Sequence, residues 1–141
     1  LGIEALSRGA KRAIFIEKNP KVFTLLKQNL TTLKIPKERY LLLPISAESF
    51  LQNSEQYLPQ NAIESRLHLF LDPPFFAELY EETLTALKES RLFEKISSLS
   101  LEMPAQNQLE TSTTTEKLSP LISYRKKGSR ESMLELFIRP Q

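Results

Sequence analysis

Three short, mostly apolar runs divide the first half of the chain, and a helical pattern follows each of them. The runs occupy residues 13–16, 40–45 and 67–71. A run without polar alternation is typical of a strand that is covered on both faces of a sheet. Because strands that alternate with helices return to the same sheet in the same direction, the pattern predicts an α/β fold with a mostly parallel sheet.

The C-terminal third predicts a different kind of pairing. A fourth strand is expected over Lys95–Leu101, ending at Glu102, and a polar stretch follows it. Two further apolar segments, 122–125 and 133–138, flank Lys127-Gly128 and predict an antiparallel hairpin at one edge of the sheet. No repeat interrupts the chain, so we expect one domain over residues 1–141.

Helix boundaries are marked by specific residues. Asn19-Pro20 has the residue types of an N-cap and a first helical position, and Gly9 stands where the first helix should stop. The helix after Pro20 is expected to bury its periodic apolar residues, which are Val22, Leu25, Leu26, Leu30 and Leu33. A shorter helix is expected over Ala47–Gln56, with Phe50 and Leu51 facing inward.

Composition excludes several kinds of site. The chain has no Cys, one His and three Gly, so a thiolate metal site, a His-rich metal site and a complete glycine-rich phosphate loop are all absent from it. No apolar run approaches the roughly 20 residues that span a bilayer, and no signal peptide is visible, so we expect a cytoplasmic protein without metal or membrane partners. The lone His68 lies inside a strand, where packing is its more common role.

Polar residues follow three of the predicted strands. Open parallel sheets bind ligands beyond the carboxyl ends of their strands, so Glu17, Ser46-Ala47 and Asp72 are the candidate site residues. A carboxylate at the position of Glu17 can accept both hydroxyls of a ribose, which suits either a nicotinamide dinucleotide or S-adenosylmethionine.

Asp72-Pro73-Pro74-Phe75 is the most informative string in the chain. Two prolines cannot continue a central strand because both lack an N–H group, and they hold the backbone extended. The Asp72 carboxylate and the Pro73 carbonyl can accept the two hydrogens of an exocyclic amine and aim its nitrogen at an electrophilic methyl group. Phe75 can stack on the base. A plain turn with a core phenylalanine is the alternative interpretation.

The predicted hairpin carries a basic cluster. Lys126, Lys127 and Arg130 lie near its tip, where cationic side chains can meet RNA phosphates. The net charge of the chain is only +2, which permits a nucleic-acid partner without indicating one.

Several strings resemble, in order, a family of bacterial enzymes. The segments are Leu1–Ala10, Phe15–Lys18, Lys27–Leu30, Ser46–Leu51, Leu69–Phe75, Glu81–Leu84 and Lys127-Gly128. Together they resemble the 16S ribosomal RNA guanine-N2 methyltransferases, and the resemblance covers essentially the whole chain. It implies a Rossmann-like, class I methyltransferase fold, S-adenosylmethionine as cofactor, and ribosomal RNA or the assembling small ribosomal subunit as partner of a monomer.

The resemblance also implies residue roles. Glu17 would hold the cofactor ribose, and Ser46 and Ala47 would lie beside the adenine. Gly2, Lys18 and Asp72 complete the expected cofactor-binding set. Asp72, Pro73, Pro74 and Phe75 would hold and stack the target guanine.

Two departures from the family pattern qualify these roles. The family's first strand and glycine-rich loop would precede Leu1, so we expect an N-terminally truncated domain with half of its cofactor site. Ser46 stands where an acidic or amide residue is common, so its contact with adenine would go through the backbone.

Other functions remain open from the sequence. The same chemistry on adenine in DNA or on a protein glutamine is one alternative, although relatives of that kind often carry Asn at the position of Asp72. A non-catalytic RNA-binding fragment is the other.

Overall fold

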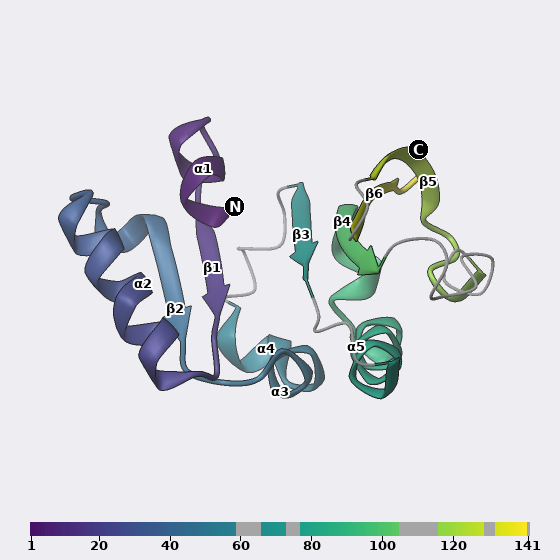
Figure 1. Cartoon of the computed structure of the whole chain (residues 1–141), viewed down its shortest axis with the longest axis horizontal. Helices are drawn as coiled ribbons and strands as arrows, with labels where there is room; N and C mark the ends of the chain where they lie inside the picture. Colours follow the sequence, from purple (N-terminus) through teal and green to yellow (C-terminus); the bar gives the residue numbers. More distant parts are fainter. Residues whose placement is uncertain (59–65, 73–76, 105–115, 129–131, 141) are drawn as a thin grey trace. The chain divides into compact units, whose positions relative to one another are not determined.

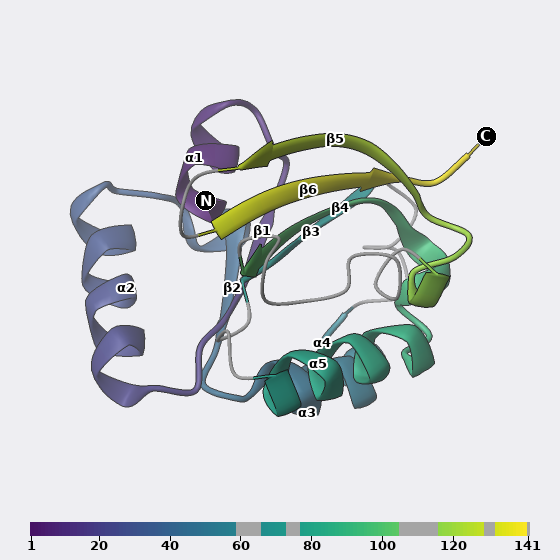
Figure 2. The ribbon, with the colours of Figure 1, turned by 45° about the vertical axis from the view of Figure 1, so that its right-hand side comes forward.

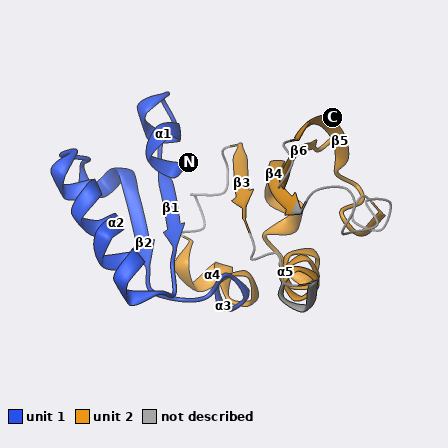
Figure 3. Ribbon diagram, viewed as in Figure 1, with its two compact units in different colours: residues 1–50 blue, residues 51–141 orange. Residues whose placement is uncertain are grey.

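A computed structural model describes residues 1–58, 66–72, 77–104, 116–128 and 132–140. The chain divides into two compact units, Leu1–Phe50 and Leu51–Gln141, each of which is described by itself (Figure 3). Within the described residues, no helix has both the length and the apolar character needed to cross a bilayer.

The first unit contains two parallel strands and their connecting helix (Figure 1). Its elements are α1 (Gly2–Ser7), β1 (Ala13–Ile16), α2 (Pro20–Thr32), the 3₁₀ helix η1 (Lys37–Arg39) and β2 (Tyr40–Leu43). The register runs from Ala13 opposite Tyr40 to Ile16 opposite Leu43. Both strands are half-buried along their whole length, whereas full burial was expected from their unbroken apolar sequence.

Local interactions set the ends of these elements as the sequence predicts. The Asn19 side chain accepts hydrogen bonds from the backbone N–H groups of Lys21 and Val22, and Pro20 is the first residue of α2. Gly9 follows α1 with a φ of 98°, a conformation that side chains other than glycine's rarely adopt. The expected N-cap of α2 at Asn19 and the expected end of α1 near Gly9 are both confirmed.

Arg39 fixes the segment that joins α1 to β1. Its Nη2 donates to the carbonyl oxygen of Ala10 at 2.7 Å and to that of Leu6 at 3.3 Å. Its Nε donates to the carbonyl oxygen of Lys11 at 3.0 Å. One guanidinium thereby bonds three carbonyl oxygens between the end of α1 and the start of β1.

The expected inward face of α2 is only partly correct. Leu30 is buried, but Val22, Leu25 and Leu33 are 46%, 56% and 57% exposed. Helical spacing thus identifies the apolar residues of α2, but only part of that stripe is covered.

The helix expected over 47–56 is two helices. They are α3 (Ala47–Gln52) and α4 (Ser54–Tyr57), separated at Asn53. Phe50 and Leu51 are 5% and 2% exposed, which confirms that they face inward.

The second unit is a four-stranded mixed sheet with one long helix (Figure 2). Its further elements are β3 (Leu67–Leu71), α5 (Ala77–Glu89), the 3₁₀ helix η3 (Phe93–Lys95), β4 (Ile96–Pro104), β5 (Ile122–Gly128) and β6 (Ser132–Ile138). The strand order is β3-β4-β6-β5. β3 and β4 are parallel, and β6 is antiparallel to both β4 and β5, which confirms the expected hairpin at the edge.

Three strand ends differ from the prediction. β2 ends at Leu43 rather than at residue 45, whereas β4 and β5 run further than expected. β4 pairs with β6 as far as Pro104 opposite Ser132, so Glu102 lies inside the strand rather than at its end. β5 continues through Gly128, which lies opposite Met133, so Lys127-Gly128 is strand and not turn. In both places, pairing with β6 extends a strand beyond its apolar run.

The two sides of this sheet differ in burial. One side of β4 and β6 carries Leu99, Leu101, Met103, Met133 and Phe137, all buried, and α5 contributes Tyr80, Leu84 and Leu87 to the same core. The opposite side includes Phe70 and Leu134, which are 41% and 43% exposed. Leu134 alternates with buried residues along β6, as expected for a strand with one covered side.

Candidate functional site

Glu17 follows β1 directly and is held in place by its neighbours. Its backbone N–H donates to the carbonyl oxygen of Leu43 at 3.1 Å, which extends the pairing of β1 with β2 by one residue. Its Oε1 accepts a hydrogen bond from the backbone N–H of Asn19 at 2.7 Å. Among the described residues nothing donates to Oε2, so this oxygen can accept a hydroxyl of a ligand.

Ser46 and Ala47 lie after β2, at the same edge as Glu17 because β1 and β2 are parallel. The Ser46 hydroxyl accepts from the backbone N–H of Ser49 at 3.1 Å, and the Ser46 carbonyl accepts from Phe50 at 3.0 Å. Ser46 therefore caps α3, and Ala47 is the first residue of that helix. The structure thus brings together three of the predicted cofactor-binding residues.

Gly2 and Lys18 have simpler surroundings. A Cβ added at Gly2 would overlap the ring of Phe15, lying 2.9 Å from its Cζ, so the lack of a side chain lets α1 pack against β1. Lys18 is exposed. A cofactor contact by either residue stays a prediction.

Asp72 follows β3, in the second unit, beside Glu102 of β4. Leu71 lies opposite Leu101, so the next residue along each of these parallel strands is a carboxylic acid. Partial burial, and then the charge of Glu102, raise the pKa of Asp72 above its ordinary value. The other members of the predicted string, Pro73, Pro74 and Phe75, lie outside the described residues.

Glu102 was absent from the predicted site. The sequence carried a signal for it, because an acidic residue after a buried apolar strand was the feature that singled out Glu17. The sequence predicted that the fourth strand ends at Glu102, but only the residues that follow the first three strands were taken as site candidates.

His68 has the packing role expected of it. Its Nδ1 lies 2.5 Å from the Ser98 hydroxyl and its Nε2 lies 3.0 Å from the Ser100 hydroxyl, so both ring nitrogens are engaged by β4. Its ring meets that of Phe70 edge-on, with centroids 4.3 Å apart. Desolvation lowers the pKa of His68, which favours the neutral ring at neutral pH.

The basic residues of β5 divide between the two sides of the sheet. Lys126 lies opposite Glu135, and its Nζ is 3.1 Å from Glu135 Oε1. Arg125 and Lys127 lie opposite Leu136 and Leu134, on the other side. Arg130, the third predicted RNA-binding residue, lies outside the described residues.

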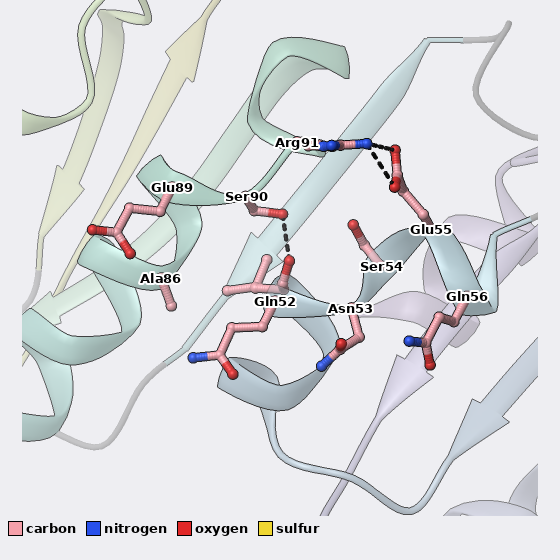
Figure 4. A pocket seen from close by; sticks show the side chains of 10 residues that line it. Gln52, Asn53, Ser54, Glu55, Gln56, Ala86, Glu89, Ser90 and Arg91 are labelled. Carbon is pink, nitrogen blue, oxygen red and sulfur yellow. Dashed lines mark hydrogen bonds and ion pairs between the residues drawn. The ribbon is translucent and has the colours of Figure 1, made fainter.

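One polar pocket is formed by α4 and the ends of α3 and α5 (Figure 4). Arg91 Nη1 donates to both carboxylate oxygens of Glu55, at 3.1 and 3.0 Å, and Ser90 Oγ donates to the carbonyl oxygen of Leu51 at 2.6 Å. These contacts join the helices to each other. None of the predicted site residues lines this pocket, and the described part of the chain contains no group of three or more potential metal ligands.

The chain is similar to proteins named as ribosomal RNA methyltransferases. It is 34% identical over 129 residues to ribosomal RNA small subunit methyltransferase D of Haemophilus influenzae, covering 89% of this chain and 64% of that protein. The protein of the same name from Escherichia coli K12 is also 34% identical, over 89% of this chain and 61% of its own length. The chain thus spans less than two thirds of either relative.

Solved structures give the same result for the fold. A Haemophilus influenzae protein described as a candidate methylase superposes with a TM-score of 0.72 at 27% identity, covering 99% of this chain and 80% of that one. A candidate methyltransferase from Escherichia coli superposes with a TM-score of 0.69 at 27% identity, covering 99% of this chain and 69% of that one. The expected Rossmann-like methyltransferase fold, with its antiparallel hairpin at the C-terminal edge, is confirmed. Residues 1–138 match the family described as conserved hypothetical protein 95, and the chain belongs to that family.

Proposed function

We propose that this protein transfers a methyl group from S-adenosylmethionine to the exocyclic N2 amine of a guanine in 16S ribosomal RNA. The observation that carries the proposal is the position of Asp72, directly after β3 of a methyltransferase fold and before two prolines and a phenylalanine. The names of the two methyltransferase D relatives support the choice of small-subunit RNA.

The residues at the edge of the first unit suit this cofactor. When bound, S-adenosylmethionine supplies a methyl group made electrophilic by a positively charged sulfur. A ribose offers hydroxyl hydrogens, and Glu17 offers a carboxylate with one oxygen that no described residue occupies. The capping role of Ser46 leaves the backbone around Ala47 as the natural partner of an adenine ring.

Asp72 would act on the amine. A guanine amine is a weak nucleophile because its lone pair is delocalised into the ring. An acceptor that takes one amine hydrogen orients the nitrogen, and orientation alone can contribute on the order of 7–11 kcal/mol in well-placed systems. The Pro73 carbonyl would take the second hydrogen, and Phe75 would stack on the base.

The raised pKa of Asp72 suits the end of the reaction. As the nitrogen bonds to the methyl carbon, the sulfur–carbon bond breaks, and the nitrogen must then lose one proton. A carboxylate whose pKa is raised by partial burial and by Glu102 is a better acceptor for that proton than an ordinary surface aspartate. The chain therefore needs neither a cysteine nor a catalytic histidine.

The remaining parts of the proposal concern partners and location. We expect a cytoplasmic monomer that meets ribosomal RNA, either free or in the assembling small subunit. Exposed basic residues of β5 are the candidate contacts with RNA phosphates.

Single-turnover transfer of labelled methyl groups tests the chemistry. With the full-length protein and small-subunit RNA or particles, Asp72→Ala is expected to slow transfer by at least about 100-fold. Glu89→Ala removes an exposed carboxylate from α5 and serves as the control. An unchanged rate in Asp72→Ala, or a methyl group found anywhere but on guanine N2, would contradict the proposal.

A further inference from the structure

We propose that Glu102 determines specificity in this reaction, by accepting the N1–H of the guanine whose N2 amine is held by Asp72. The inference rests on the proposed function and adds a residue to it. It concerns how the site distinguishes guanine from purines that lack a hydrogen at N1.

The sheet places the two carboxylates as neighbours. β3 and β4 are parallel, with Leu69 opposite Leu99 and Leu71 opposite Leu101. Asp72 and Glu102 are the next residues of the two strands, and neighbouring strands lie about 4.8 Å apart. The charge of Glu102 contributes to the raised pKa of Asp72, which agrees with their proximity.

Glu102 differs from comparable acids of the same unit. Glu81 and Glu135 are also shielded from solvent to some degree, and each has a lysine partner, Lys117 and Lys126 respectively. Glu102 is half-buried and has no hydrogen bond or cationic partner among the described residues. It lies opposite Leu134 of β6, which offers no polar group from its side chain.

A carboxylate without a cation is suited to a ligand that brings hydrogen-bond donors. Asp72 and Glu102 together can only accept hydrogen bonds when ionised. Guanine presents two neighbouring donors, the N2 amine and N1–H, on nitrogens that are both bonded to C2. Adenine and 2-aminopurine carry a lone pair at N1, which would face the Glu102 carboxylate with no hydrogen between them. Such an unmatched pair disfavours binding, and sites built this way reject the wrong partner strongly.

RNA that carries 2-aminopurine in place of the target guanosine tests this role. The analogue keeps the amine that receives the methyl group and loses N1–H together with the O6 oxygen, so the contribution of N1–H is read from how the Glu102 variant changes the ratio between the two substrates. For the wild-type protein, single-turnover methyl transfer to guanosine is expected to be at least about 100-fold faster than transfer to 2-aminopurine.

Glu102→Gln should reduce that ratio to below about 10-fold, since the glutamine amide can donate to the N1 lone pair. Glu89→Gln, on the exposed side of α5, should leave the ratio at its wild-type value. Circular dichroism of both variants reports whether they fold. If Glu102→Gln does not fold, Glu102→Asp is used, and its shorter reach should also lower the ratio.

The outcomes separate the two proposals. A wild-type protein that leaves guanine N2 unmethylated overturns the proposed function and this inference with it. A wild-type protein that methylates guanine N2, together with a folded Glu102 variant of unchanged ratio, overturns only the role of Glu102. A ratio that falls in the Glu102 variant and not in the Glu89 variant supports it, because a merely structural residue would slow both substrates equally.

Discussion

Lys126 Nζ lies 3.1 Å from Glu135 Oε1, across the pairing of β5 with β6. Glu135 is 1% exposed and lies on the buried side of the sheet, whereas the Lys126 side chain is 42% exposed. The lysine thus reaches from the sheet edge to a carboxylate within the core. Its charge serves the fold, although the sequence had grouped it with residues expected to contact RNA.

Removing this lysine should destabilise the protein. Lys126→Met leaves a buried carboxylate without a cation, and we expect a loss of roughly 1–3 kcal/mol in the free energy of unfolding. This is less than for a fully buried pair, because water still reaches the lysine. Urea denaturation measures the change. Combining Lys126→Met with Glu135→Leu should recover most of the loss, and a double variant as unstable as the single one would contradict this account.

RNA affinity should depend on Lys127 and much less on Lys126. Lys127 projects from the opposite side of β5 and has no carboxylate partner among the described residues. Lys127→Ala should weaken RNA binding and reduce the slope of log affinity against log salt by about 1. Fluorescence anisotropy at several salt concentrations gives both values. The Lys126→Met/Glu135→Leu variant is the control. If it weakens RNA binding as much as Lys127→Ala does, the two sides of β5 do not differ in their contribution to RNA affinity.

Glu17→Ala should weaken binding of S-adenosylmethionine. A lost hydrogen bond to a charged group is worth roughly 1.5–3 kcal/mol, which corresponds to about a tenfold or greater rise in Kd. Isothermal titration calorimetry of the full-length protein measures it. Glu38→Ala removes an exposed acid from η1 of the same unit and should leave Kd unchanged. Equal Kd values for wild type and Glu17→Ala would place the ribose elsewhere.

Asp72→Asn should raise the free energy of unfolding at neutral pH. Because the folded-state pKa of Asp72 is raised, folding is favoured while the group is protonated, and that advantage is lost as pH rises through the folded-state pKa. The wild type therefore carries an unfavourable charge at pH 7 that asparagine removes. Thermal unfolding should show a higher Tm for Asp72→Asn at pH 7, with the difference disappearing toward pH 3. A difference independent of pH would contradict this explanation.

Strand positions were predictable where an apolar run meets an abrupt change of chemistry. β1 and β3 begin and end where the sequence predicts, and after β3 the two prolines that follow Asp72 in the sequence cannot continue a central strand. The first helix stop and the cap of α2 were also predictable, since Gly9 and Asn19 act through their own backbone and side chain. Such features depend on neighbours along the chain alone.

Features that depend on pairing between distant segments were not predictable. Nothing near Glu102 shows that β6 will extend β4 to Pro104, and nothing near Lys126 shows that Glu135 will be buried opposite it. The exposure of Leu25 has the same origin, because helical spacing identifies an apolar stripe without showing how much of it a small sheet can cover. The acidic neighbour of Asp72 is therefore a finding of the structure.

The basic sequence of β5 has a consequence for how copies of the protein meet. β5 is the last strand in the order of its sheet, and Arg125, Lys126 and Lys127 are consecutive along it. A second copy that added its own β5 side by side would bring two rows of positive charge together. The outermost strand therefore disfavours fibril-like growth through self-repulsion, to which Arg125 and Lys127 contribute most because Lys126 is paired with Glu135.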